Sequence, residues 1–361
     1  MWSGLPGRRW LPRWRWPCWR GSRCRERLSW RGGSVGRRRR KCLLQRDEVV
    51  RAEGELRSEQ TDAPLLSVRD LRVSFSGVEA VRGVSFDVRA GEVLAIVGES
   101  GAGKSLTARA LLGMLPREAV RGGAVEPDLS GQRGRRIALV PQDALSALSP
   151  VHPVGDQLAA AVRSVRRVSR TEARALAVAA LERVGIPDAA RKARAYPHEY
   201  SGGMRQRAVV AMATVNEPEI LVADEPTTAL DEERREQVLA LLRAQASALV
   251  LVTHDVESVR RHADRVLVMY AGRVVELGPA ERVLGAPRAP YTAGLLASLP
   301  RPGGPKRLPV LAGNPPLPGA VSAGCAFAPR CSFVTEVCRV TEPEPREADG
   351  RTVACHHWER V

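Results

Sequence analysis

The chain has 361 residues, of which 44% are hydrophobic and 27% charged, and its formal net charge is +16. This length and composition are typical of a soluble globular protein of two or three modest domains. They exclude an integral membrane protein, because no stretch approaches the roughly eighteen uncharged apolar residues of a spanning helix. If the protein works at a membrane, another molecule must anchor it.

Nearly all of the excess positive charge lies at the start of the chain. Residues 1–46 hold 15 of the 56 Lys and Arg but a single acidic residue, Glu26, so the rest carries 41 basic against 39 acidic residues. The Trp- and Arg-rich residues 1–60 are therefore predicted to be a disordered tail, without the apolar core of a secretory signal. Two interpretations remain open: an RNA- or membrane-binding arm, or a stretch that is never translated because the gene begins near Val49 or Val50. For the nearly neutral remainder no nucleic-acid partner is expected.

From Leu65 onward the sequence alternates between strand-like and helix-like segments. Residues 91–100 run from a turn into a continuous apolar stretch, which indicates a buried parallel strand. Residues 169–185 begin with Ser, place apolar residues at helical spacing and end with Gly, which predicts a helix. The other expected elements are strands at 65–75, 81–88, 137–142, 219–226 and 247–255, a helix at 106–115, and two strands joined by an Ala-Gly turn at 266–278. This alternation predicts a three-layer α/β domain over residues 61–280, followed by a Pro-rich extended connector at 300–320.

A glycine-rich loop lies between the strand at 91–100 and the helix at 106–115. Its sequence, GESGAGKS, fits the pattern G-x-x-x-x-G-K-[ST] of a phosphate-binding loop. Glycines let backbone N–H groups turn inward around phosphates. Lys104 is expected to reach the β- and γ-phosphates, Ser105 to offer its hydroxyl to Mg²⁺, and the helix start to add its positive end. The predicted members are Gly98, Ser100, Gly101, Ala102, Gly103, Lys104, Ser105 and Leu106.

Two further features accompany this loop. An apolar strand ends in Asp224 and Glu225, where an Asp can hold Mg²⁺ and the Glu could orient or activate an attacking water. The stretch YSGGMRQR, residues 200–207, places Ser and two Gly before a predicted helix, which is a second anion-binding helix start. Because one nucleotide already has its phosphate loop, we predict that this second cradle serves a nucleotide held by another subunit. Without the other motifs, residues 200–207 would be interpreted as an ordinary Gly-rich turn before a helix.

Together these motifs resemble those of the ATP-binding-cassette (ABC) ATPases, in family order from about Leu65 to Gly278. Gln142 matches the Q-loop, TALD at 228–231 the D-loop, and His254 the switch histidine. The resemblance implies a P-loop ATPase fold with a helical subdomain at about 153–200, two cassettes closing head to tail on two ATP, and these roles. Glu225 and His254 would be catalytic. Phe75 would stack on adenine, Gln142 would bind ATP together with the phosphate loop, and Mg²⁺ would be held by Ser105, Gln142 and Asp224. Across the dimer, Asp231 would couple the two sites, and the partner's ATP would be contacted by Ser201, Gly202, Gly203 and Met204.

Residues 281–361 resemble the C-terminal region of the ATPases of dipeptide, oligopeptide and nickel importers. The segment APYTAGLLASLP at 289–300, a Pro-rich stretch and GCAFAPRC at 324–331 carry this resemblance. It implies import of peptides or related solutes through two separate membrane permease subunits, with a second ATPase, identical or different, and indirectly an extracytoplasmic solute-binding protein. The chain would then lie peripherally on the cytoplasmic face of the cell membrane. The alternative is a soluble cassette in DNA repair or translation, which the single cassette without a coiled-coil insertion disfavours.

Four cysteines, Cys325, Cys331, Cys338 and Cys355, lie close together in this region. A reducing cytoplasm argues against disulfides, so four neighbouring thiols suggest a metal, either zinc or a [4Fe–4S] cluster. The spacing C-x₅-C-x₆-C-x₁₆-C lacks the C-x₂-C pairs of common zinc sites, which favours the cluster, as does the resemblance to the importer ATPases. His356 and His357 keep zinc open, and free thiols in a packed lobe remain a third possibility. We expect a small Cys-containing accessory domain with little hydrophobic core, held together by the metal.

Overall fold

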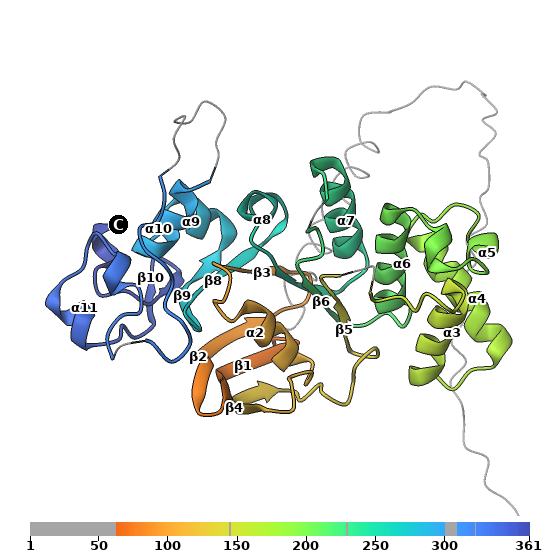
Figure 1. Ribbon diagram of the computed structural model, residues 1–361, viewed down its shortest axis with the longest axis horizontal. Coiled ribbons are helices and arrows are strands. Elements are labelled where there is room, and N and C mark those ends of the chain that lie inside the picture. The colour runs from red at the N-terminus through yellow and green to blue at the C-terminus, as the bar shows by residue number, and fades with distance from the viewer. Residues whose placement is uncertain (1–62, 144–145, 229, 300–308, 322) are drawn as a thin grey trace, which may run out of the picture. The chain divides into compact units, whose positions relative to one another are not determined.

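The computed structural model describes residues 63–143, 146–228, 230–299, 309–321 and 323–361 (Figure 1). Asp62–Val361 forms one compact unit. The predicted tail at 1–60 and part of the predicted connector lie outside the described residues. Across the described part of the connector, residues 309–320, the backbone has no helix or strand.

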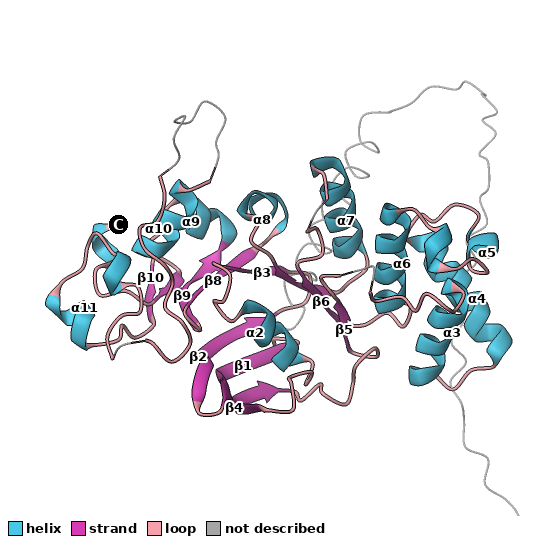
Figure 2. Cartoon of the chain, in the orientation of Figure 1, coloured by secondary structure: helices cyan, strands magenta, loops and turns pink. Residues whose placement is uncertain are grey.

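An eight-stranded mixed sheet, in the order β10-β11-β9-β8-β3-β7-β6-β5, forms the centre of this unit (Figure 2). The five strands from β8 to β5 are parallel, and β9, β11 and β10 add on in antiparallel fashion. β3, β6 and β7 are buried along their whole length, as their continuous apolar runs predict. The strands are β3 Val93–Val97, β5 Ile137–Val140, β6 Ile220–Asp224, β7 Ala248–Val252, β8 Arg265–Tyr270, β9 Arg273–Pro279, β10 Arg346–Ala348 and β11 Arg351–Val353.

A second, three-stranded antiparallel sheet has the order β2-β1-β4. Its strands are β1 Leu66–Phe75, β2 Val78–Val88 and β4 Ala119–Glu126. Helix α2, Lys104–Leu111, shares one hydrophobic cluster with this sheet and the central strands. The helix begins at Lys104, where the phosphate-loop motif places its start, and Gly103 in the left-handed region lets the loop turn directly into it.

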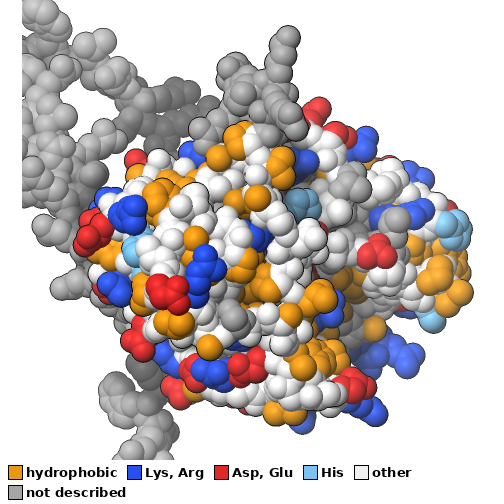
Figure 3. Space-filling view, turned by 60° about the vertical axis from the view of Figure 1, so that its left-hand side comes forward, with side chains coloured by type: hydrophobic (Ala, Val, Ile, Leu, Met, Phe, Trp, Pro, Cys, Tyr) orange, Lys and Arg blue, Asp and Glu red, His pale blue; other side chains and the backbone are white. Residues whose placement is uncertain are grey.

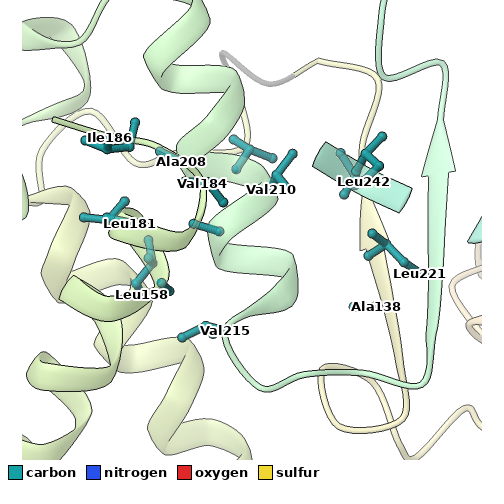
Figure 4. Close-up of a cluster of buried hydrophobic side chains, with 14 of the residues drawn as sticks. Ala138, Leu158, Leu181, Val184, Ile186, Ala208, Val210, Val215, Leu221 and Leu242 are labelled. Atoms are coloured by element: carbon teal, nitrogen blue, oxygen red, sulfur yellow. The ribbon is translucent and has the colours of Figure 1, made fainter. Parts of the chain in front are cut away.

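Between β5 and β6 in the sequence, the chain forms a group of helices. It comprises α3 Val154–Val165, α4 Arg170–Arg183, α5 Ala189–Lys192 and α6 Gly202–Thr214, with a 3₁₀ turn at Pro197–Glu199. The helix predicted at 169–185 is confirmed as α4, and the Ser169 hydroxyl caps it by accepting from the Glu172 N–H. Side chains of α3, α4 and α6 form one cluster that continues to Ala138 and Leu221 of the sheet and to Leu242 of α7, Glu232–Ala244 (Figure 4). The apolar faces of these helices therefore fix them against β5, β6 and α7.

The C-terminal segment does not form the separate accessory domain that the sequence suggested. Strand β11 pairs with β9, with Thr352 opposite Leu277, and so extends the central sheet. Phe327 is buried among the aromatic rings of Tyr270 and Tyr291, in a cluster that includes side chains of β3 and β8. The accessory domain is therefore not confirmed, because the buried side chains of this segment pack into the core of the cassette. Its helices are α9 Ala280–Gly285, α10 Pro290–Ala297 and α11 Glu336–Val340, with 3₁₀ turns at Ala328–Arg330 and Trp358–Arg360; α8, Val256–His262, precedes β8.

A buried ion pair joins β9 to β11. The Glu276 carboxylate, fully buried, accepts from the Arg351 guanidinium at 3.2 Å and from the backbone N–H groups of Arg288 and Ala289. Arg351, 5% exposed, also donates to two backbone carbonyls of α9 and its end. The buried pair thus connects two strands and the start of α10 at one point.

At the surface, by contrast, basic and acidic side chains are interspersed on the face that Figure 3 brings forward.

Replacing Glu276 by Ala should lower the free energy of unfolding by about 3–5 kcal/mol, because Arg351 would remain buried without its counter-charge. Urea denaturation of the full chain measures this loss. The double variant Glu276→Leu, Arg351→Met is the control and should recover much of it, since an apolar pair of similar size needs no charge compensation. A single variant as stable as the parent would contradict the assigned role of the pair.

Candidate functional site

The phosphate-loop pattern adopts a tight turn between β3 and α2. Gly98 has φ +148°, and a Cβ added there would lie 2.1 Å from the Met269 carbonyl oxygen on β8, so the close approach requires glycine. Gly103, with φ +95°, directly precedes α2. The Nζ of the buried Lys104 donates to the carbonyl oxygens of Gly98, at 2.9 Å, and Glu99, at 3.0 Å. The loop therefore closes around the lysine, and the predicted contact of Lys104 with the phosphates stays a prediction.

Electrostatics at this lysine act in two directions. Burial lowers the pKa of Lys104, whereas the carboxylates of Glu225, Asp224 and Glu99 oppose that change. A charged lysine beside a helix start and inward-turned amides is the arrangement that anions such as phosphates favour. The local geometry therefore suits a nucleotide phosphate.

Oxygen ligands for a cation lie next to the loop. The Ser105 hydroxyl at the start of α2 donates to Asp224 Oδ1 at the end of β6, at 2.8 Å. Burial raises the pKa of Asp224, and the Ser105 hydrogen bond is the largest opposing effect. A hydroxyl and a carboxylate at this position are hard oxygen donors of the kind that Mg²⁺ takes. These two residues fit the predicted magnesium site.

Glu225 connects three of the predicted site residues. Its Oε2 accepts from Gln142 Nε2 at 3.1 Å and lies 3.4 Å from His254 Nδ1. Thr228, the first residue of the D-loop match, to which the sequence analysis gave no role of its own, also donates its hydroxyl to this oxygen at 3.2 Å. The His254 side chain is 63% exposed and that of Glu225 19%, so both are open to a ligand. The Q-loop, D-loop and switch residues thus converge on one carboxylate oxygen.

The Glu225 backbone has an unusual conformation. Its φ is +46°, in the left-handed region that a glutamate seldom adopts. The strained turn is fixed by the Glu225 N–H, which donates to the Val252 carbonyl oxygen of the neighbouring strand β7 at 2.8 Å. Backbone strain of this kind is found at functional sites when neighbouring structure enforces it. Here it directs the carboxylate toward Gln142 and His254.

The residues predicted to act on a partner's nucleotide lie elsewhere in the chain. Ser201 caps α6 by accepting from the Met204 N–H at 3.3 Å, and Ser201 and Gly202 are exposed. Nothing lies within 4 Å of a Cβ added at Gly202 or Gly203, so this helix start is open. Figure 1 shows α6 with the other helices of its group, apart from α2. The single chain does not bring this set to its own phosphate loop.

Asp231 and Phe75 are also placed outside the cluster around Glu225. Asp231 caps α7 by accepting from the Arg234 N–H at 2.9 Å. Phe75 ends β1, half-buried beside the hydrophobic cluster of the small sheet. Their predicted roles in dimer coupling and adenine stacking therefore remain predictions.

The four cysteines line one pocket, together with Phe327, His356 and His357. All four are free thiols. Burial raises the pKa of Cys325 and Cys331, and it raises that of Cys355 to about 11. Among the residues that the structure describes, no group of three or more His, Cys, Asp or Glu is arranged to hold a metal ion. The expected iron–sulfur cluster, and zinc as its alternative, are not supported by this geometry.

No helix in the described part of the chain is both long and apolar enough to cross a membrane.

Residues 81–228 match the family model of the ABC transporter domain, and residues 275–338 match that of the oligopeptide/dipeptide transporter C-terminal region. An oligopeptide transport ATP-binding protein of Mycobacterium tuberculosis is 45% identical over 322 residues, which are 83% of this chain and 53% of the relative. The chain thus spans about half the length of that relative.

Other proteins are similar over nearly their full length. The dipeptide transport ATP-binding protein of Bacillus subtilis is 42% identical over 315 residues, 81% of this chain and 94% of the relative. Among solved structures, the ATP-binding cassette MJ0796, dimeric in a post-hydrolysis state with ADP and Pi, is 25% identical with a TM-score of 0.51, over 60% of this chain and 99% of that one. The cassette fold expected from the sequence is confirmed.

Asp224→Asn should stabilise the protein at neutral pH when nucleotide and metal are absent. Burial raises the folded-state pKa of Asp224 above its ordinary 3.8, so the free energy of unfolding falls as the pH rises from there through the raised value. The substitution removes this loss and keeps an acceptor for Ser105. Urea denaturation of both proteins in a chelator, from acid to neutral pH, should show a gain that vanishes at the acid end. If the variant were less stable than the parent at neutral pH, the attraction of the Asp224 carboxylate to Arg109 and Lys104 would outweigh the cost of burying that carboxylate.

Proposed function

Since the chain belongs to the ABC transporter family of oligopeptide and dipeptide transport ATP-binding proteins, we propose that it binds and hydrolyses ATP to energise import of peptides or related solutes such as nickel. The observation that carries this proposal is the convergence of Gln142, Glu225 and His254 beside the phosphate loop. The alternative, a soluble cassette in DNA repair or translation, has no support from relatives named for peptide transport.

The proposed chemistry assigns one role to each group. Lys104 and the loop amides bind the β- and γ-phosphates, with Phe75 against the adenine. Ser105, Asp224 and Gln142 would hold Mg²⁺, which would supply positive charge beside the phosphates. Glu225 accepts a proton from the attacking water or orients it. His254, which lies beside the same Glu225 oxygen, contacts the γ-phosphate and helps Glu225 to position the water.

A second cassette completes each site in this proposal. Ser201, Gly202, Gly203 and Met204 would contact ATP on the partner, and Asp231 would link the two sites. The exposed, open start of α6 supports this role, as does the dimeric ADP-bound state of the similar cassette. The partner is an identical or a different ATPase.

We place the chain peripherally at the cytoplasmic face of the cell membrane. It would dock on two membrane permease subunits and act indirectly with an extracytoplasmic solute-binding protein. The C-terminal region shared with oligopeptide and dipeptide transporters supports this assignment. No nucleic-acid partner is included.

For the four cysteines we keep the sequence-based expectation of a metal centre, with a [4Fe–4S] cluster as the first choice and zinc as the second, although no group among the described residues is arranged to hold a metal ion. What supports it is that the four thiols line one pocket. Burial first, and then the neighbouring thiols, raise the pKa of Cys325 and Cys355. Without a cation, the thiols of Cys325, Cys331 and Cys355 are protonated at neutral pH, because burial raises the pKa of each. A bound metal would favour the thiolate forms.

Glu225→Gln should retain ATP binding and lower ATP turnover roughly a hundredfold or more, because the amide cannot accept the proton of the attacking water. Steady-state hydrolysis and equilibrium binding of ATP measure the two effects. Glu219→Gln, the same change at the other end of β6 beside Arg136, is the matched control and should hydrolyse ATP normally. Near-normal turnover in Glu225→Gln would remove that residue from its role.

Protein purified without oxygen should contain iron and absorb in the visible blue, and Cys338→Ser should lose both properties. Elemental analysis separates iron from zinc. Replacement of Cys18, Cys24 and Cys42, which precede the described residues, is the control and should leave the metal in place. A colourless protein with neither element would reject the metal centre.

A further inference from the structure

Glu99, the second residue of the phosphate loop, is held by groups from the C-terminal segment. Its backbone N–H donates to the Tyr291 hydroxyl at 2.9 Å. Its carboxylate accepts two hydrogen bonds from Arg330, at 2.7 and 2.9 Å. The third polar group of Glu99, its carbonyl oxygen, accepts from Lys104 Nζ. One residue thus connects the C-terminal segment directly to the lysine of the phosphate loop.

Arg330 is itself fixed on several sides. Its side chain is 5% exposed. Its Nε donates to the Ala312 carbonyl oxygen at 2.8 Å, and Nη1 also donates to the Tyr270 hydroxyl at 3.2 Å. The guanidinium lies over the rings of Tyr270 and Phe327, 5.7 and 5.8 Å from their centroids. These hydrogen bonds and ring contacts together hold the guanidinium in one orientation.

The aromatic residues that support this contact form a rigid group. The rings of Tyr270 and Tyr291 are 4.5 Å apart at their centroids, and Phe327 meets both at 5.4 Å. Burial raises the pKa of Tyr291 well above its ordinary value, so its hydroxyl stays neutral and can accept from the Glu99 N–H. Tyr270 follows Met269, the residue whose carbonyl oxygen lies against Gly98.

Attachment of the C-terminal segment does not depend on Arg330. Glu342 pairs with Arg82 of β2, at 2.8 Å, and with Arg273 of β9. Arg351 pairs with Glu276, also of β9. These contacts join the segment to strands, whereas the Arg330 contact joins it to the phosphate loop.

We propose that Arg330, together with Tyr291, is a positioning residue for nucleotide binding, which holds Glu99 so that the loop presents Lys104 to the phosphates. A loop that is already ordered loses less conformational entropy when ATP binds. The C-terminal segment therefore sets the ATP affinity of the cassette. This inference rests on the proposed ATP binding.

Replacement of Arg330 by Gln should weaken equilibrium ATP binding by the full chain roughly tenfold, which corresponds to about 1.4 kcal/mol. In steady-state hydrolysis the same variant should raise KM more than it lowers kcat. Arg330→Lys keeps the charge without the paired hydrogen bonds and should recover part of the affinity. Adding Glu99→Gln to Arg330→Gln should cost little further affinity, because the two changes remove one interaction. Tyr291→Phe removes the acceptor of the Glu99 N–H and should weaken binding in the same direction, which provides a test if Arg330→Gln does not fold.

Glu342→Gln is the matched control, since it weakens another attachment of the same segment to the cassette. It should lower the melting temperature and leave ATP affinity unchanged. Hydrogen exchange of the loop amides at 98–103, measured without nucleotide, should be faster in Arg330→Gln and Tyr291→Phe than in the parent or the control. Parent-like ATP affinity and exchange in both Arg330→Gln and Tyr291→Phe, or equal weakening by Glu342→Gln, would overturn the inference. If the parent did not bind ATP, the proposed function would fail, while loop exchange would still decide whether Arg330 positions the loop.

Discussion

The parallel pairing of β6, β7 and β3 is the constraint on which the candidate site depends. Asp224 lies opposite Val252, and Ile96 of β3 lies opposite the same residue on the other side. This register brings the carboxyl ends of the three strands to one edge, where the phosphate loop, Glu225 and His254 follow. The Glu225 N–H bond to Val252 then turns the chain at that edge. A shift of one residue between these strands would separate the groups that the site needs together.

Local sequence was sufficient for the parts of this site that lie at strand ends. The phosphate loop, Asp224 and Glu225 lie at the ends of short apolar runs that indicate buried strands, so their position at strand ends could be predicted. The α4 helix was predictable for a similar reason, because Ser169 supplies a cap at its start. The shared contact of Gln142 and His254 with one oxygen of Glu225 needed the register of three strands, which no local pattern contains.

Contacts between distant residues explain what the sequence did not reveal. Glu99 and Arg330 are separated by 231 positions, and nothing near either residue indicates the other. The cysteines drew attention to residues 325–355, yet the neighbours that matter most for the fold are Phe327 and Arg330. The accessory domain was expected from the resemblance of residues 281–361 to the C-terminal region of importer ATPases and from the four cysteines. It was not found, because Phe327 and β11 use the core and the sheet edge of the cassette itself.

Strand β11 has a consequence for how the protein is made. The edge of β9 that it covers is synthesised about seventy residues before Arg351–Val353, and chains fold from the N-terminus as they emerge at roughly 5–20 residues per second. During that interval β9 presents unpaired backbone groups, the kind of edge that invites pairing with other chains. The edge of β9 therefore stays open until β11 has been synthesised and can pair with it.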